Sequence, residues 1–266
     1  MKKTNSVLAI LQARTSSSRL PGKVLRPLLG QPMLQRQIER IQRASLLDGL
    51  LVATSLKPED DGVAKLCQET GLPCFRGSLE DVLDRYYQAA CRHEPTHVVR
   101  LTGDCPLADP EVIDQVIRCH LKGGYDYTSN TFPATWPDGL DVEVIRFSAL
   151  ESAWQEARLP SEREHVTPFV RHAPDRFAIG HVRHTEDLSH WRWSVDYGED
   201  FELISRIYEA LHPQQPDFGT GKILELLAKD PQLAKINHHY TANDGWFKSL
   251  NEDEAFLAAK KPHQVS

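Results

Sequence analysis

The stretch VLAILQARTSSSRLPGKVLRPLLGQPMLQRQIERIQRA, residues 7–44, decides the fold of this chain. It opens with an apolar run, Val7 to Ala13, whose length and composition predict a buried β-strand. A basic, hydroxyl-rich loop follows. After Pro32, which suits the first turn of a helix, apolar residues recur at helical spacing through Ile41. A strand, a loop and a helix in this order are the opening unit of an α/β protein.

The rest of the chain alternates in the same way between apolar runs and amphipathic segments. We predict further strands at 50–54, 96–101, about 142–145, 177–184 and 191–195. Helices are predicted at 58–71, at 78–92 after a capping box at Ser78 and Asp81, and at 109–124, 147–157, 162–172, 199–211 and 219–228. The pattern indicates an α/β fold, with a mostly parallel central sheet and helices on both faces.

Domain organisation follows from the same pattern. Residues 1–236 are predicted to form one domain, in which the rhythm loosens over 124–190. Residues 237–266 read as a polar C-terminal tail on the surface, with Trp246 and Phe247 as its main anchors.

Composition excludes several classes of protein. With 266 residues, 40% of them hydrophobic and 26% charged, the chain has the proportions of an ordinary globular protein and can bury a core without disulfides or a structural metal. Its five cysteines, expected to be mostly buried thiols, are odd in number and form no CxxC pair. The apolar run Val7 to Leu11 is too short for a signal-peptide core or a membrane span, so we expect a cytoplasmic protein without a membrane partner.

Charge is distributed unevenly along the chain. Residues 1–47 carry nine Lys or Arg and one acidic residue, whereas the whole chain has a net charge of −6. A nucleic-acid-binding protein usually shows positive charge over a whole face, so this composition argues against nucleic acid as a partner. It predicts a local site for a small polyanion.

The loop from Arg14 to Lys23 is the first candidate site. Ligands of open α/β sheets bind beyond the carboxyl ends of the strands, where this loop lies. Over ten residues it offers three cations, including Arg19, and four serine or threonine hydroxyls in the run that contains Ser17 and Ser18. Such donors suit a triphosphate, although the loop matches neither of the common phosphate-loop motifs. The alternative is a solvated basic loop, which the position after the first strand disfavours.

Two aspartates at strand ends are the next candidates. Asp104, in RLTGDCP, follows an apolar strand and is expected to point into the same crevice, where Mg²⁺ is usually held by one or two carboxylates and substrate phosphates. A helix or turn cap is its alternative role. Asp196, in WSVDYGED, also ends a predicted strand and could supply a second carboxylate, which spacing alone does not establish.

A further acidic motif, DGLDVEVI at 138–145, is typical either of a metal or sugar site or of a simple turn into a strand. Asp141 and Glu143 are two residues apart on the predicted strand and would therefore share a face.

Long parts of the chain resemble a known enzyme family. The opening stretch from Ile10 to Ala44 is similar to that of the cytidylyltransferases that include the CMP-Kdo and CMP-sialic acid synthetases, in particular the branch named for the spore-coat polysaccharide protein SpsF. Further matching stretches are VATSLKPEDD, FRGSLEDVLDRYYQAA, VVRLTGDCPLADPEVID, DGLDVEVI, SEREHVTPFV and SVDYGEDFELI. The resemblance implies a Rossmann-like, GT-A-like nucleotidyltransferase domain over 1–236, with 124–190 as an acceptor or dimerisation region, and a homodimer.

The resemblance also implies roles for individual residues. Catalytic roles fall to Lys23, Arg14, Arg19 and Asp104, and Asp104 with Asp196 would hold one or two Mg²⁺. The residues implied in nucleotide binding are Arg14, Ser17, Ser18, Arg19, Lys23, Asp84, Arg85 and Thr102. Arg163 and His165, in the stretch SEREHVTPFV, would join Asp141 and Glu143 at the acceptor.

The expected function is therefore CTP-dependent transfer of a cytidylyl group to a sugar, an acidic one of the nonulosonic or a related class, with release of pyrophosphate, for surface polysaccharide synthesis. Cys105, Arg100 and the longer tail depart from the sugar-acid synthetases and leave the acceptor open. Two alternatives are a glycosyltransferase of the same fold that uses a nucleotide sugar, and a nucleotide-binding protein without catalysis.

Overall fold

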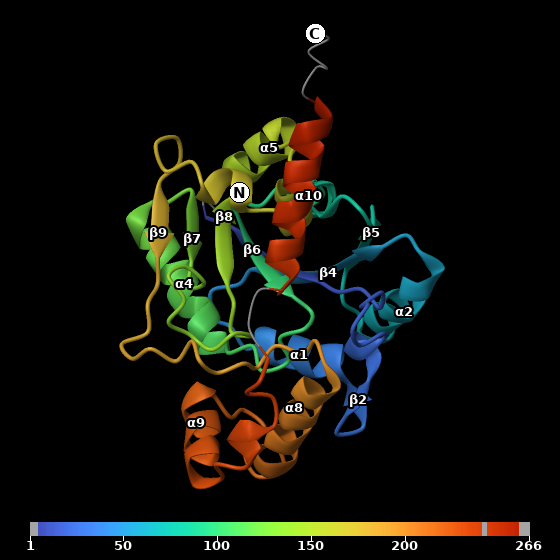
Figure 1. Cartoon of the computed structure of the whole chain (residues 1–266), viewed down its shortest axis with the longest axis vertical. Coiled ribbons are helices and arrows are strands. Elements are labelled where there is room, and N and C mark those ends of the chain that lie inside the picture. Colours follow the sequence, from blue (N-terminus) through green and yellow to red (C-terminus); the bar gives the residue numbers. More distant parts are fainter. Residues whose placement is uncertain (1–4, 241–243, 261–266) are drawn as a thin grey trace.

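The computed structural model describes residues 5–240 and 244–260. Seven strands form one sheet in the order β5-β4-β1-β6-β8-β7-β9 (Figure 1). The first four strands in this order are parallel, and β8 runs antiparallel to both of its neighbours. The predicted mostly parallel sheet is therefore confirmed.

The elements have the following bounds. The strands are β1 Val7–Gln12, β2 Pro27–Leu28, β3 Gln31–Pro32, β4 Gly49–Ser55, β5 Cys74–Gly77, β6 His97–Thr102, β7 Tyr127–Ser129, β8 Glu143–Arg146 and β9 Ile179–His181. The helices are α1 Met33–Ile41, α2 Asp61–Thr70, α3 Val82–Cys91, α4 Pro110–Gly123, α5 Phe147–Glu156, α6 Pro160–His165, α7 Pro168–Arg171, α8 Gly198–Leu211, α9 Thr220–Lys229 and α10 Asp244–Lys260.

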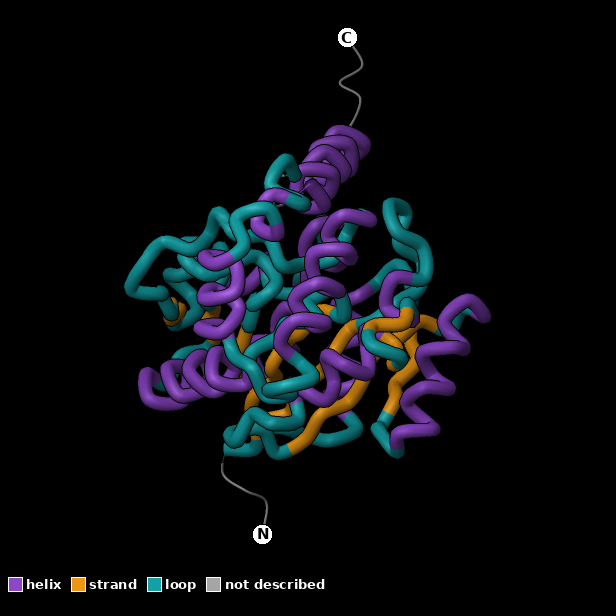
Figure 2. Tube along the Cα trace, turned by 90° about the horizontal axis from the view of Figure 1, so that it is seen from below, coloured by secondary structure: helices purple, strands orange, loops and turns teal. Residues whose placement is uncertain are grey.

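Two hydrophobic cores cover the two faces of the sheet. Alternate residues of β1 enter different cores: Ala9 and Leu11 pack with α1, α2, α4, α8 and α9, whereas Leu8 and Ile10 pack with α3, α5 and α7. Helices accordingly lie on both sides of the strands, as Figure 2 shows. Both faces of β1 are buried, which explains why its sequence is apolar without alternation.

The strand order reverses between β1 and β6. The chain runs from β1 to β4 and β5 on one side, then returns through α3 to β6 on the other side of β1. The crevice at the carboxyl ends of two such strands is where open α/β sheets bind ligands. Just after β6, Gly103 lies so close to the end of β1 that a Cβ there would be 2.9 Å from Cβ of Ala13 and 3.0 Å from the carbonyl oxygen of Gln12.

Several predicted elements differ from the structure. The predicted strand 191–195 does not form, since its only β-type pairing is an isolated bridge between Asp138 and Arg192. The predicted helix 162–172 is divided into α6 and α7 at Val166, whose φ of 74° no helix accommodates. The 78–92 helix begins at Val82, because Asp81 rather than Ser78 caps it by accepting a hydrogen bond from the backbone N–H of Asp84.

Other elements had no counterpart in the prediction. The strands β5 and β7 and the small β2–β3 hairpin are only two to four residues long. Such short segments carry too few residues for a period-2 pattern, so tertiary pairing alone defines them. The predicted strand 177–184 is confined to β9.

Part of the polar tail is the helix α10. Its Asp253 accepts hydrogen bonds from the backbone N–H and the hydroxyl of Ser161 on α6, and both residues are buried. The segment 237–240 precedes the tail helix and contacts α8 through Asn237 and Tyr240. The side chains of Trp246 and Phe247, predicted as anchors, lie outside the described residues.

All five cysteines are free, but only Cys67 and Cys105 are buried, and Cys74 is exposed. The expectation of mostly buried thiols was therefore wrong. None of the helices in the described ranges combines the length and the apolar character needed to cross a membrane.

Candidate active site

The loop after β1 is held in place by Asp60, which sequence analysis had assigned only to the start of a helix. Oδ1 of this buried carboxylate accepts hydrogen bonds from the backbone N–H of Thr15 at 2.7 Å and from its hydroxyl at 2.9 Å, and the hydroxyl of Ser55 donates to Oδ2 at 2.5 Å. Burial acts to raise the pKa of Asp60, but these hydrogen bonds outweigh it and lower the pKa below its usual value. An ionised carboxylate thus fixes the first residues of the basic loop.

Lys23 lies at the end of the same loop and points into the crevice. Gly22, with a φ of 71°, turns the chain so that Lys23 begins a short 3-10 turn. Its ammonium Nζ donates to the carbonyl oxygen of Val195 at 2.5 Å, to Oδ1 of Asp196 at 2.9 Å and to Oδ2 of Asp104 at 3.3 Å. The side chain is 8% exposed. Three segments that are distant in the sequence therefore meet at one nitrogen atom.

Lys23, Asp104 and Asp196 stabilise one another in their charged forms. Burial acts to lower the pKa of Lys23, but the carboxylates of Asp104 and Asp196 outweigh it and raise the pKa above its usual value. Burial acts in turn to raise the pKa of both aspartates, and the Lys23 ammonium is the largest influence that brings each pKa below its usual value. The lysine is therefore a cation, and both aspartates are anions, near neutral pH.

Asp196 is surrounded by cations. While Oδ1 accepts from Lys23, Oδ2 contacts a guanidinium nitrogen of Arg19 at 2.7 Å and one of Arg192 at 2.9 Å. The backbone N–H groups of Asp196 and Tyr197 both donate to Oδ2 of Asp200 at 2.9 Å, at the start of α8. The helix end thus holds the backbone of the residue whose side chain gathers the cations.

Arg192 is a site residue that sequence analysis missed. Its guanidinium bridges three carboxylates, those of Asp138 at 3.2 Å, Asp196 at 2.9 Å and Asp200 at 3.1 Å, and its side chain is 8% exposed. The carboxylates raise its pKa against the opposing effect of burial. The sequence places Arg192 four residues before Asp196. Because a straight strand was predicted over 191–195, the bend that brings both side chains to one centre was not expected.

The chain that follows α9 returns to this network. The amide Nδ2 of Asn237 donates to Oδ1 of Asp200 at 2.8 Å and to the carbonyl oxygen of Arg192 at 2.9 Å. Tyr240 stacks on Tyr197 with ring centroids 4.0 Å apart, and the guanidinium of Arg19 lies 5.2 Å from the centroid of the Tyr197 ring. Tyr240 therefore supports, through Tyr197, the loop that carries Arg19.

The carboxylates can be tested as ligands of a divalent ion. Within the ranges 5–240 and 244–260, no three His, Cys, Asp or Glu side chains are arranged to hold a metal by themselves. Asp104 and Asp196 nevertheless converge on one cation, the Lys23 ammonium. Mg²⁺ commonly takes one or two carboxylates and completes its shell with water and substrate phosphates. The two aspartates fit that habit, and do not form a complete cage of protein ligands.

The other residues predicted to bind nucleotide surround the loop to different degrees. Arg14 is 3.8 Å from Glu164 on α6, with both side chains partly exposed. Ser17 accepts a hydrogen bond from the backbone of Leu20 at 3.2 Å, and Ser18 is exposed. The hydroxyl of Thr102 lies 3.4 Å from the sulfur of Cys105, next to Asp104.

Asp84 and Arg85 point to different sides of α3. Oδ1 of Asp84 accepts a hydrogen bond from Nε1 of Trp154 at 2.8 Å, in a shallow surface pocket between α3 and α5. Arg85 is fully buried and donates to the carbonyl oxygen of Ser78 at 2.5 Å. Burial lowers the pKa of Arg85, with Arg14 as a further neighbouring cation. Of the two, only Arg85 faces the loop that carries Arg14.

The predicted acceptor residues Asp141 and Glu143 do not share an environment. Asp141 is exposed, whereas Glu143 begins β8 and is 5% exposed. Oε1 of Glu143 accepts hydrogen bonds from the hydroxyls of Tyr127 and Thr167, both at 2.6 Å, and Oε2 pairs with Arg100. Because β8 starts only at Glu143, Asp141 lies just before the strand on which the two residues were expected to share a face.

Arg163 and His165 on α6 are bonded within the protein. Arg163 pairs with Asp81 at the N-terminus of α3 and donates to the carbonyl oxygen of Trp154 at 2.9 Å. Nε2 of His165 is 2.9 Å from the hydroxyl of Ser249 on α10, and burial lowers the pKa of this histidine to about 4. Their predicted contact with an acceptor stays a prediction.

The comparison with known proteins agrees with this site. The family profile of the cytidylyltransferases matches residues 8–218. SpsF, the spore coat polysaccharide biosynthesis protein of Bacillus subtilis, is 34% identical over 245 residues, which cover 86% of this chain and 97% of SpsF. The uncharacterized protein MJ1063 of Methanocaldococcus jannaschii is 37% identical over 233 residues, which cover 87% of this chain and 94% of that protein.

Solved structures place the fold in the same group. A cytidylyltransferase from Leptospira borgpetersenii superposes with a TM-score of 0.83 at 30% identity, covering 90% of this chain and 99% of that one. A CMP:2-keto-3-deoxy-manno-octonic acid synthetase, solved with CTP, shares the fold with a TM-score of 0.61 at 18% identity, covering 77% of this chain and 99% of that one. The chain therefore belongs to the cytidylyltransferase family of nucleotidyltransferases.

Proposed function

We propose that the protein transfers the cytidylyl group of CTP to a sugar hydroxyl and releases pyrophosphate. The proposed acceptor is an acidic sugar of the nonulosonic or a related class, and the product serves surface polysaccharide synthesis. Supporting this choice, SpsF takes part in spore coat polysaccharide biosynthesis by its name, and a 3-deoxy-manno-octulosonate cytidylyltransferase of Pelobacter propionicus is 36% identical over 115 residues, 42% of this chain. We propose that the enzyme acts in the cytoplasm as a homodimer.

The meeting of Lys23, Asp104 and Asp196 at the topological switch point is the observation that carries the proposal. A buried ion pair seldom adds net stability, because desolvation of the charges opposes their attraction, so we assign this arrangement a role in ligand binding. When a triphosphate enters this crevice, its α-phosphate can take up the positive charge that Lys23 presents. Arg14 and Arg19, both partly exposed on the same loop, then face the rest of the phosphate chain.

The proposed reaction is a displacement at the α-phosphorus. A bond forms between the acceptor oxygen and the α-phosphorus, and the proton of the acceptor hydroxyl passes to solvent water. The bond to the oxygen bridging the α- and β-phosphates breaks, and pyrophosphate carries away the electron pair. Negative charge grows on the phosphoryl oxygens and on the leaving group, where Lys23, Arg14 and Arg19 stabilise it. Holding donor and acceptor in one crevice supplies the remaining advantage.

Asp104 and Asp196 are the proposed residues for a divalent ion, Mg²⁺, that enters with the nucleotide. Such an ion supplies further positive charge to the phosphates. Arg192 and Asp200 fix the position and the charge of Asp196, and Lys23 keeps both carboxylates ionised until the ion arrives.

The remaining predicted residues have proposed roles around this centre. Ser17, Ser18 and Thr102 offer hydroxyls to the nucleotide, and Asp84 and Arg85 lie on the helix behind the loop. Asp141 is the predicted acceptor residue with an exposed side chain, and Asp104 and Asp138 are among the charges that act on it. We place the acceptor sugar there, and Glu143, Arg163 and His165 around it.

The test is a product assay. The protein is incubated with Mg²⁺, each of the four nucleoside triphosphates and a panel of sugar acids and sugar phosphates, and pyrophosphate is measured. We expect pyrophosphate only with CTP and a sugar acid. Lys23→Met should lose at least about 10³-fold in rate, the scale of one missing oxyanion donor. Lys65→Met, which removes a lysine that is 74% exposed on α2, is the charge-matched control and should keep the rate.

Two results would contradict the proposal. Release of a nucleoside diphosphate from a nucleotide sugar would indicate a glycosyltransferase. Tight binding of CTP without turnover on any acceptor would indicate a nucleotide-binding protein.

A further inference from the structure

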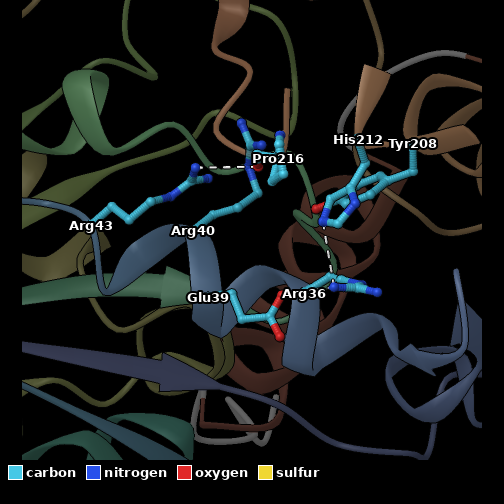
Figure 3. A pocket seen from close by; sticks show the side chains of 7 residues that line it. All are labelled: Arg36, Glu39, Arg40, Arg43, Tyr208, His212 and Pro216. Atoms are coloured by element: carbon cyan, nitrogen blue, oxygen red, sulfur yellow. Dashed lines mark hydrogen bonds and ion pairs between the residues drawn. The ribbon is translucent and has the colours of Figure 1, made fainter. Parts of the chain in front are cut away.

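Another pocket lies between α1 and the segment from α8 to Pro216 (Figure 3), and its lining does not include Lys23, Asp104 or Asp196. Its volume of about 200 Å³ is several times the roughly 30 Å³ that one molecule takes in liquid water. Three of its lining residues, Arg36, Arg40 and Arg43, follow one another at helical spacing on the same face of the chain around α1. The remaining lining residues are Glu39, Tyr208, His212 and Pro216.

Arg40 is the buried member of this set. It is 2% exposed and donates from Nε to the carbonyl oxygen of Ala108 at 2.8 Å, while the Phe218 ring lies 4.5 Å from its guanidinium carbon. Within the described part of the chain, its Nη1 has no hydrogen-bond partner and the guanidinium has no carboxylate in an ion pair. Burial acts first among the influences that lower its pKa, and Arg43 adds to it. The carboxylate of Asp109 acts on Arg40 from nearby without pairing with its guanidinium, so it offsets the positive potential of this buried cation only in part.

The other two arginines extend this potential to the surface. Arg43 is exposed, and its Nη1 donates a hydrogen bond to the carbonyl oxygen of Pro216 at 3.3 Å. Arg36 pairs with Glu39 at 3.1 Å, and its Nη1 also lies 3.4 Å from Nε2 of His212. Burial, followed by Arg36, lowers the pKa of His212, so the imidazole is mostly neutral at pH 7. Three guanidinium groups therefore face the pocket against one carboxylate, on a chain whose net charge is −6.

We propose that this pocket binds a compact oxyanion of the phosphate class, either a free phosphate or pyrophosphate ion or the phosphoryl group of a nucleotide. Guanidinium groups suit such ligands because their planar forks donate two hydrogen bonds at once. Arg43 and Arg36 contact the anion directly, and the buried Arg40 adds positive electrostatic potential beneath the pocket. Glu39 lowers the affinity for the anion, because it pairs with Arg36. The inference does not depend on the proposed transferase reaction.

The pocket lies directly behind the Asp104 loop. Arg40 donates to the carbonyl oxygens of Leu107 and Ala108, and the hydroxyl of Tyr208 donates to that of Pro106 at 2.8 Å. Two lining residues thus hold the backbone just after Asp104.

Calorimetric titration of metal-free protein with inorganic pyrophosphate, and in a second arm with CMP, tests the proposal at constant ionic strength. The protein carries Arg14→Ala and Arg19→Ala, which replace two partly exposed side chains and so weaken anion binding by the loop from Arg14 to Lys23. We expect saturable binding in at least one arm. Adding Arg43→Ala should weaken it about tenfold, the scale of one charge-assisted hydrogen bond. Adding Glu39→Gln should tighten it about threefold, because Arg36 is released.

Arg183→Ala is the charge-matched control, since Arg183 is an exposed arginine after β9. It should change the affinity less than twofold. A background protein that binds neither probe, or an affinity that Arg43→Ala and Arg183→Ala lower equally, overturns the proposal. Loss of cytidylyl transfer has no bearing on this result, because no turnover is measured.

Discussion

The two ends of the proposed site use charged residues in opposite ways. At the nucleotide end, Lys23, Asp104 and Asp196 meet in a crevice, and the side chain of Asp104 is 32% exposed. At the acceptor end, Glu143 is 5% exposed, and both of its oxygens are occupied by Arg100, Tyr127 and Thr167. The first cluster can exchange its internal partners for a ligand, whereas the second is complete without one.

The difference arises from position in the sheet. Lys23 and Asp104 follow the carboxyl ends of β1 and β6, where the chain leaves the sheet and the side chains reach the crevice. Glu143 stands inside an antiparallel pair, opposite Arg100 in the register of β6 and β8. Cross-strand neighbours of opposite charge pair with each other. The same residue types are therefore open to a ligand at a strand end and bound internally within the sheet.

Asp104→Asn should give the largest effect and break the nucleotide end. It removes one of the two carboxylates that hold Lys23 and that we propose for the divalent ion. We expect CTP-dependent pyrophosphate release to fall by about 10³-fold while the fold is kept. Stopped assays of pyrophosphate and circular dichroism of the same preparations measure both. Asp217→Asn, at an exposed position, is the matched control, and normal turnover by Asp104→Asn would remove this residue from the centre.

Glu143→Gln should instead act on stability. It leaves the guanidinium of Arg100, 15% exposed, without its charged partner. Breaking a buried pair in this way typically costs about 3–5 kcal/mol, so the free energy of unfolding should fall by about 3 kcal/mol in urea titrations. Asp141→Asn, at an exposed neighbour, should keep the stability and raise KM for the acceptor. If Glu143→Gln changes KM for the acceptor and not the stability, then Glu143 contacts substrate and the contrast between the ends fails.

Arg192→Lys sharpens the comparison by loosening the support of Asp196. The ammonium of a lysine is a compact point charge without the planar fork of the guanidinium, which contacts Asp138, Asp196 and Asp200 through different nitrogen atoms. We expect kcat/KM to fall about 10–30-fold, with a higher Mg²⁺ concentration needed for half-maximal rate, because a positioning contact is lost. The Mg²⁺ dependence is the decisive measurement, since a merely structural role would leave it unchanged.

Mild acid should produce the smallest effect and act on the stability of the fold rather than on the nucleotide end. His97 and His120 are buried together, 2.9 Å apart, with burial lowering their pKa values to about 4 and about 3. Below pH 6.5 the unfolded chain binds protons that the folded pair excludes, so stability present above pH 6.5 is lost as the pH falls toward 4. We expect on the order of 1 kcal/mol per ring at pH 5.5.

Thermal melts at pH 7.5 and 5.5 measure this loss. His120→Gln should flatten the difference between the two melting temperatures. The nucleotide end should keep its charge state, because the pKa values of Asp104 and Asp196 lie below their usual range. Equal melting temperatures of the unmodified protein at both pH values would show that the pair is not buried in its neutral form.

Much of the fold was readable from the sequence. The strands β1, β4 and β6 and the helices α1, α4 and α8 lie close to their predicted positions, because long apolar runs and helical periodicity survive any tertiary arrangement. The segments whose prediction failed are short or bent. The strands β5 and β7 have only four and three residues, and the segment 191–195 bends before α8 and forms a single isolated bridge at Arg192. Their form depends on neighbours that a single sequence does not reveal.

The candidate site divides in the same way. The sequence alone determined that a cationic loop follows the first strand and that an aspartate follows the strand at 97–102, since both are local patterns. Only the tertiary structure decided that Lys23 lies 3.3 Å from Asp104 and 2.9 Å from Asp196, that Arg192 joins three carboxylates, and that Glu143 is closed off. Distances between segments more than 80 residues apart depend on strand order and on the bend before α8. Neither is written in any local pattern, because both result from how the whole chain buries its two cores.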